Sequence, residues 1–147
     1  MNKSLPDKWI RKAIFDVLDD LVVDGMLIPC YDTHVVYDAQ KDEPEHYILM
    51  TTQSNEVDKR NKCEWLWESS ILLDIITSYN GAGNPGSRLL ADNILEAARS
   101  ALQGLTLDPG SGLEIITIDW SFPADISTNT GAEVIFRKFL RLELQIK

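Results

Sequence analysis

The segment from Cys63 to Tyr79 constrains the fold more than any other, because apolar and polar residues alternate along it with a period of two. Side chains of a β-strand point alternately to the two faces of a sheet, so this pattern predicts one long strand with an apolar and a polar face. The apolar series is Trp65, Trp67, Ile71, Leu73, Ile75 and Thr77, and the polar series is Glu64, Glu68, Ser70 and Asp74. A helix is the alternative, because four positions between Leu66 and Thr77 also fit helical spacing.

A second alternating segment lies at 132–146, where Val134, Phe136, Leu140, Leu142, Leu144 and Ile146 occupy one face. It follows a predicted strand at 113–122 and a loop at 123–131 that is rich in Ser, Thr, Asn and Asp. Two alternating segments separated by about ten residues predict an antiparallel hairpin.

Two other segments repeat their apolar residues at helical spacing. The first, at 6–23, has Pro6 in its first turn, Ser4 and Asp7 as capping residues, and Gly25 as a left-handed stop. The second, at 87–103, follows the Gly-rich stretch 81–86 and is closed by Gly104. Both segments are predicted to be amphipathic helices.

The remaining segments predict shorter strands and loops. Met26 to Tyr31 reads as a short strand that Pro29 confines to a sheet edge or a bulge. His46 to Thr52 reads as another strand, and 54–62, dominated by charges and Asn, as a loop or hairpin tip. Strands and helices are segregated, which predicts an α+β fold: a mostly antiparallel β-sheet with two main helices packed on one face and a C-terminal β-hairpin. At 147 residues, the chain 1–147 is expected to be a single domain.

The charge of the chain is strongly acidic, with 14 basic against 23 acidic residues and a net charge of −9. Affinity for nucleic acids comes mostly from Lys and Arg that neutralise phosphates, so this balance argues against a protein that grips DNA. The acidic charge suits a protein that lines a passage for DNA, because repulsion stops the DNA from sticking to the wall. The longest apolar runs fall well short of the roughly 18 residues that cross a bilayer, and the N-terminus lacks the apolar core of a signal peptide. We therefore expect no membrane contact.

Residue patterns for catalysis or cofactor binding are weak. The glycines at 81–86 match neither a dinucleotide nor a Walker motif, and they are typical of a helix-entry loop. A metal site could use Asp32, His34 and Asp38, but this pattern is weak and occurs by chance in many loops. No cysteine has metal-ligand spacing. Cys30 and Cys63 are expected to be buried free thiols, with a disulfide as the alternative. We predict no catalytic residue, no cofactor and no metal.

Trp65 and Trp67 lie two residues apart and point the same way on a strand. We expect them to fill the core under the helices, and a patch at a protein interface is the alternative because Trp is enriched there. The polar loop before the last strand is either a plain hairpin loop or an arm that orders against a neighbour. Its Ser127, Asn129 and Thr130 join the two tryptophans as candidate oligomer-interface residues.

The order of these segments resembles that of the tail terminator and tail completion proteins of tailed bacteriophages. The resemblance is carried first by the amphipathic helix, Ile28-Pro29-Cys30-Tyr31-Asp32 and the strand Tyr47-Ile48-Leu49. It continues through the long strand ending Leu73-Asp74-Ile75-Ile76-Thr77, the helix at 91–102, and a closing hairpin that ends Phe139-Leu140-Arg141-Leu142-Glu143-Leu144. Cys30 stands where the family often has Val.

The resemblance implies a virion protein, made in the host cytoplasm, that forms a ring in the neck or tail. The ring is commonly a hexamer, with a dodecamer as the alternative. It stops tail-tube growth and joins the tail to the head connector, with other neck and tail proteins as partners and DNA passing near it. Two other hypotheses stay open: a small acidic cytosolic binding module, such as an adaptor or inhibitor of a basic protein, and an enzyme that uses scattered carboxylates.

Overall fold

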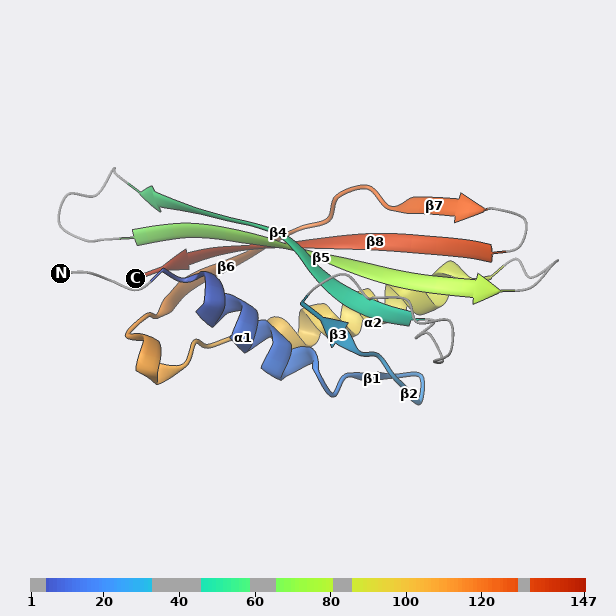
Figure 1. Cartoon of the computed structure of the whole chain (residues 1–147), viewed down its shortest axis with the longest axis horizontal. Helices are drawn as coiled ribbons and strands as arrows, with labels where there is room; N and C mark the ends of the chain where they lie inside the picture. Colours follow the sequence, from blue (N-terminus) through green and yellow to red (C-terminus); the bar gives the residue numbers. More distant parts are fainter. Residues whose placement is uncertain (1–4, 33–45, 59–65, 81–85, 130–132) are drawn as a thin grey trace.

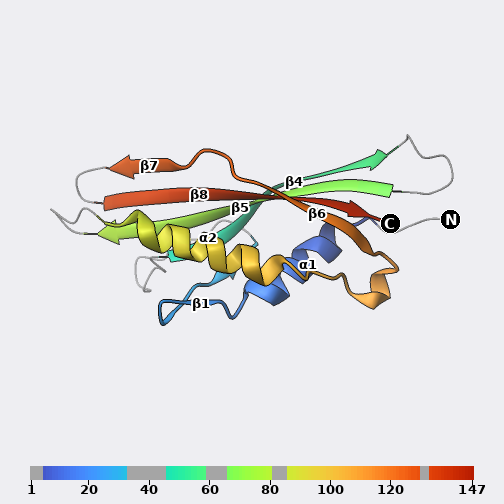
Figure 2. The ribbon, with the colours of Figure 1, turned by 180° about the vertical axis from the view of Figure 1, so that it is seen from behind.

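The computed structural model describes residues 5–32, 46–58, 66–80, 86–129 and 133–147. Within these residues six strands form one sheet in the order β3-β4-β5-β8-β6, with β7 paired to β8. Helices α1 and α2 cover the same face of the sheet (Figures 1 and 2). The elements are α1 (Asp7–Leu18), β1 (Val22–Val23), β2 (Met26–Leu27), β3 (Cys30–Tyr31), β4 (His46–Asp58), β5 (Leu66–Asn80), α2 (Arg88–Leu102), β6 (Ile115–Ser121), β7 (Ile126–Asn129) and β8 (Glu133–Ile146). The predicted α+β class is confirmed.

The ladder between β5 and β8 forms the centre of the sheet. It runs antiparallel without a shift from the Trp67–Ile146 pair to the Asn80–Glu133 pair. The odd-numbered side chains of β5 and the even-numbered side chains of β8 point toward the helices, as the two alternating segments predict. The strand prediction for this part of the chain is confirmed and the helix alternative is excluded.

The core lies between this ladder and the two helices. Its fully buried members include Ile71, Leu73 and Ile75 from β5, Leu140 and Leu142 from β8, Ile10 and Ile14 from α1, and Ile94 and Leu102 from α2. Burial of each such side chain stabilises the fold by about 1.5–3 kcal/mol before entropy is counted. The helices therefore depend on the sheet, because each presents one apolar stripe to it.

Helix α1 ends at Leu18, five residues earlier than the sequence predicts. Val22 and Val23 instead pair antiparallel with Leu27 and Met26. The turn between them has positive φ at both central residues, 52° at Asp24 and 79° at Gly25, which is the geometry that an Asp-Gly dipeptide favours in a two-residue hairpin. Gly25 was predicted as a helix stop, and this is wrong because it serves a hairpin turn.

Pro29 divides the predicted strand at 26–31 into two pieces. Met26–Leu27 pairs with β1, whereas Cys30–Tyr31 pairs parallel with Ile48 and Leu49 of β4. Proline cannot donate to a strand ladder, but its carbonyl still accepts the backbone N–H of Ile48 at 2.9 Å. The change of partner at Pro29 gives the sheet its parallel pair.

Strand β4 continues to Asp58, so the prediction of a loop from residue 54 is wrong for 54–58. Its polar side chains have partners on both faces. Gln53 accepts from Arg11 Nε at 2.7 Å and donates to the backbone carbonyl of Asp7 at 3.2 Å, while the Ser54 and Ser70 hydroxyls lie 2.7 Å apart. Polar composition alone indicated a loop, but tertiary hydrogen bonds stabilise a strand here.

The prediction of a loop at 123–131 is wrong for 126–129, which form a third strand paired with β8. Residues Ile126–Asn129 form β7, which pairs antiparallel with β8 from Arg137 to Val134. Strand β6 also pairs antiparallel with β8, which confirms the predicted hairpin partners. Helix α2 begins after Ser87, whose hydroxyl accepts the N–H of Leu89 as an N-cap.

Replacing Leu140 by alanine tests the central position of β8. Leu140 is fully buried, so Leu140→Ala is expected to lower the free energy of unfolding by about 2–5 kcal/mol. Arg141→Ala, at the exposed neighbouring position, is the control and should change it by less than about 0.5 kcal/mol. Urea unfolding followed by circular dichroism measures both. Equal effects would contradict the assignment of the two faces.

Candidate functional site on the open face of the sheet

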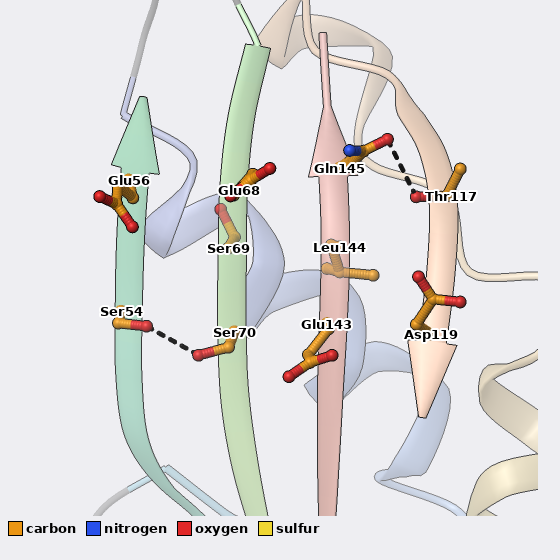
Figure 3. Close-up of a pocket in the computed structure, with 10 residues that line it drawn as sticks. All are labelled: Ser54, Glu56, Glu68, Ser69, Ser70, Thr117, Asp119, Glu143, Leu144 and Gln145. Carbon is orange, nitrogen blue, oxygen red and sulfur yellow. Dashed lines mark hydrogen bonds between the residues drawn. The ribbon is translucent and has the colours of Figure 1, made fainter. Parts of the chain in front are cut away.

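The face of the sheet opposite the helices carries two rows of polar side chains across four neighbouring strands (Figure 3). In the first row Glu56, Glu68, Gln145 and Thr117 follow one another across β4, β5, β8 and β6. In the second row Ser54, Ser70, Glu143 and Asp119 do the same. We call these eight residues the acidic rows. They come from segments far apart in the sequence and meet only because of the strand register.

Carboxylates of the acidic rows stand directly opposite one another on neighbouring strands. Glu56 is in register with Glu68, and Asp119 is in register with Glu143. Like charges in such cross-strand pairs destabilise a sheet, typically by about 0.2–1 kcal/mol each. The remaining positions are neutral, with a hydrogen bond from the Thr117 hydroxyl to Gln145 Oε1 at 3.4 Å. The arrangement costs stability, which makes it a candidate for function.

The acidic rows line a shallow open depression of about 400 Å³, with Ser69 and Leu144 also at its wall. Ser54, Glu56, Thr117, Asp119 and Glu143 are exposed. In the described part of the chain, no three His, Cys, Asp or Glu side chains converge closely enough to hold a metal ion. The depression therefore presents separated negative charges to solvent, which repel a phosphate backbone and attract cationic groups.

The other end of the open face has an ion pair between the buried carboxylate of Asp74 and Arg137, whose side chain is 42% exposed. Asp74 is 0% exposed, and Arg137 donates to its Oδ2 from Nη2 at 2.5 Å and from Nε at 3.1 Å. The hydrogen bond to Asp74 raises the pKa of Arg137. The guanidinium also lies 5.4 Å from the ring centre of Phe139, and the pair stands beside Leu49, which is in register with Asp74. Removing Arg137 would leave the buried Asp74 charge uncompensated, so the pair favours the observed alignment of β5 with β8.

The candidate interface residues from the sequence do not form one patch. Trp67 is 8% exposed and belongs to the core cluster at the end of β5 that pairs with Ile146. Ser127 and Asn129 are exposed on β7, which pairs with the opposite half of β8. Trp65 and Thr130 lie outside the described residues. The sequence does not reveal the acidic rows, because their members lie on separate strands or in a predicted loop and meet only through the strand register.

The other candidate groups have structural surroundings or lie outside the described residues. Asp32 forms an ion pair with Arg11, and His34 and Asp38 of the weak metal pattern are outside the described part. Cys30 is a buried free thiol, and burial raises its pKa to about 12, so it is not a nucleophile at neutral pH. Cys63 is also outside the described part. Among the helices described, none has the length and apolar character needed to cross a membrane.

Comparison with known proteins identifies the fold through structure alone. The sequence matches no model of a protein family and no curated protein sequence. Among solved structures, this chain is similar to a chain of the virion of a native gene transfer agent particle, with a TM-score of 0.63 and 12% sequence identity. The alignment covers 95% of this chain and 96% of that chain. At this identity the likeness shows a common fold over nearly the whole length.

Removing one charge from an acidic pair is expected to stabilise the protein. Glu143→Gln relieves repulsion from Asp119 and should raise the free energy of unfolding by about 0.5 kcal/mol at low salt. The gain should shrink at about 1 M salt, where the Debye length is only about 3 Å. Asp125→Asn removes an exposed charge outside the rows and is the control for net charge. Urea unfolding at the two salt concentrations measures the effect, and an equal gain in both variants would contradict it.

Proposed function

We propose that this protein is a structural component of a tailed-phage-like virion, which assembles as a ring in the neck or tail and joins the head connector to the tail. The observation that carries the proposal is the acidic sheet face on a fold of this kind. The fold likeness to a chain of a gene transfer agent virion supports the class of protein. The residue order that resembles tail terminator and tail completion proteins supports the place in the virion.

The distribution of charge suits a channel wall. A ring that turns the open face of the sheet inward presents Glu56, Glu68, Asp119 and Glu143 to the lumen, and leaves α1 and α2 on the outside. DNA binds proteins mainly through phosphate contacts with Lys and Arg, so an acidic wall lets DNA pass without retention. The like-charge pairs lower the stability of the sheet, but in the ring they have a function, because every copy repels the DNA that passes through.

Assembly as a ring requires two different surfaces on each copy, because a head-to-tail contact closes when the rotation between copies permits it. The hexamer that the resemblance implies would have a mass of about 100 kDa, from copies of 16.6 kDa. Light scattering behind a sizing column, at several protein and salt concentrations and with head-connector or tail proteins added, measures this mass. A discrete ring mass supports the proposal. If the protein stays a monomer under all these conditions and binds a basic protein instead, the ring proposal is wrong and the acidic binding module is the better account.

Reversing the charge of the acidic rows is expected to make the ring retain DNA. The double variant Glu68→Lys/Glu143→Lys places lysines in both rows and should bind duplex DNA at about 0.1 M salt, with an affinity that falls steeply as salt rises. The control, Asp16→Lys/Asp20→Lys, makes the same change of net charge at exposed positions in and after α1. Gel-shift titration compares the two. Equal DNA binding by both variants would contradict an inward acidic face.

We also propose that β7 is an arm that contacts a neighbouring subunit of the ring. All four of its residues are exposed, and they include Ser127 and Asn129, two of the interface residues that the sequence predicts. Ser127→Glu is expected to leave the unfolding midpoint unchanged but to lower the fraction of assembled ring, as measured by light scattering. Asp125→Asn, in the preceding loop, is the control for fold and solubility. Full assembly of Ser127→Glu would contradict a role for the arm.

A further inference from the structure

Within the described residues, the acidic end of the sheet has two free edges. Strand β3 pairs with β4 only at Ile48 and Leu49, so the segment of β4 from Gln53 to Asp58 pairs on one side alone within the described residues. Strand β6 likewise pairs only with β8 there. Figure 3 shows β4 and β6 at the two sides of the four-stranded block that carries the acidic rows. The opposite end of the sheet is extended by β3 and β7, so the free edges coincide with the acidic end.

The backbone groups at both free edges point outward in matching positions. Glu114 and Lys147 exchange both of their backbone hydrogen bonds, at 2.9 and 3.0 Å. In an antiparallel ladder, every second residue of a strand points its N–H and C=O groups to the same neighbouring strand. The Glu114–Lys147 pair therefore fixes the direction in which the backbone groups of the other residues point. Followed through the registers of β8, β5 and β4, the alternation turns the backbone groups of Ile118 and Asn55 away from their own sheet.

Two of the most effective devices against edge pairing, lysine and proline, are absent from both free segments, Gln53 to Asp58 of β4 and all of β6, although each carries acidic side chains. The β-bulges of the two strands lie at one end of each free segment, between Met50 and Gln53 in β4 and between Ile115 and Thr117 in β6. An edge of this kind is a template for another strand.

The direction of the strands allows the two edges to pair with each other in a second copy. Each of the pairs β4–β5, β5–β8 and β8–β6 is antiparallel, so β6 runs opposite to β4. Rotation about a ring axis preserves the direction of a strand along that axis. Strand β6 of one copy therefore meets β4 of the next in the antiparallel sense, and a block of four strands keeps the alternation unbroken around the ring.

The charges of the acidic rows suit the same junction. The first row ends in Glu56 on one side and Thr117 on the other, and the second ends in Ser54 and Asp119. When the rows continue from copy to copy, Thr117 stands beside Glu56 and Asp119 beside Ser54. Each carboxylate then faces a hydroxyl rather than another carboxylate, and Ile118 faces Asn55 with their outward backbone groups paired.

We propose that copies of this chain join through antiparallel pairing of β6 with the free segment of β4 in the next copy, so that the acidic rows run continuously around the ring. This inference rests on the proposed ring and names the contact that builds it. The partner is a second copy because the two edges are complementary in direction, register and charge.

Cysteine cross-linking tests the contact directly. The double variant Glu56→Cys/Thr117→Cys is expected to give, under mild oxidation, a ladder of covalent oligomers up to the ring size on a non-reducing denaturing gel. Within one copy the two positions are three strand spacings apart, about 14 Å, which is too far for the Cα separation of below about 7 Å in a disulfide. Each single variant has only one of the two edges modified and should stay uncross-linked, as should the unmodified chain with its own cysteines.

The outcomes separate this inference from the proposed function. A ring mass by light scattering without a covalent ladder would overturn the edge contact and leave the ring in place. Cross-linking of a single variant would show pairing of like edges and would also overturn it. A monomer under every condition, with virion partners present, would overturn both the contact and the ring.

A proline substitution provides an independent test of the backbone pairing. Asn55→Pro removes the outward N–H while the ladder to β5 keeps its donors on the neighbouring residues, and edge strands tolerate proline in this orientation. Asn55→Ala is the matched control, because it loses the same side-chain hydrogen bonds and retains the N–H. We expect the proline variant alone to raise the protein concentration needed for ring formation at least tenfold, with unchanged circular dichroism. Equal assembly of both variants would contradict the proposal.

Discussion

The antiparallel ladder between β5 and β8 is the constraint on which the rest of the structure depends. It runs without a shift along most of both strands, so it fixes which side chains point to the helices and which to the open face. A slip of one residue would exchange the two sets and expose Ile71, Leu73 and Leu142. The ion pair between the buried Asp74 and Arg137 opposes such a slip, because a change of register separates the two groups and leaves the Asp74 carboxylate without this partner.

The sequence predicts the two strands of this ladder, but not their pairing with each other, because its information is periodic and local. Alternation in the segments around Ile71 and Leu142 indicates strands, and helical spacing around Ile14 and Ile94 indicates the two helices. The class and the helix-covered face follow from these patterns. The prediction of a loop from Ser54 onward is wrong for 54–58, because polar composition indicates a loop there. Hydrogen bonds between Gln53 and α1 and between Ser54 and β5, which the sequence does not display, stabilise a strand instead.

The acidic rows show the limit of the same reasoning for function. Glu56 and Glu68 are twelve residues apart, and Asp119 and Glu143 are separated by a whole strand and a loop, so only the register brings them together. A net charge of −9 indicates that an acidic surface exists somewhere on the molecule, but not where. The polar face of each alternating strand was the available signal. Reading four such faces as one surface requires the strand order β4-β5-β8-β6, which the sequence alone does not provide.

The proposed arrangement of copies rests on the charge of the open face and on the strand edges. In the described part of the chain, the helices cover one face of the sheet and carboxylates gather on the other. The free edges there lie at the acidic end. Imaging of the assembled particle by electron cryo-microscopy, at a resolution that separates helices from strands, tests this account most directly. The account predicts a closed ring whose lumen is lined by the strands of the open face, with α1 and α2 outside. A ring lined by the helices, or one in which the acidic rows are buried between copies, would contradict it.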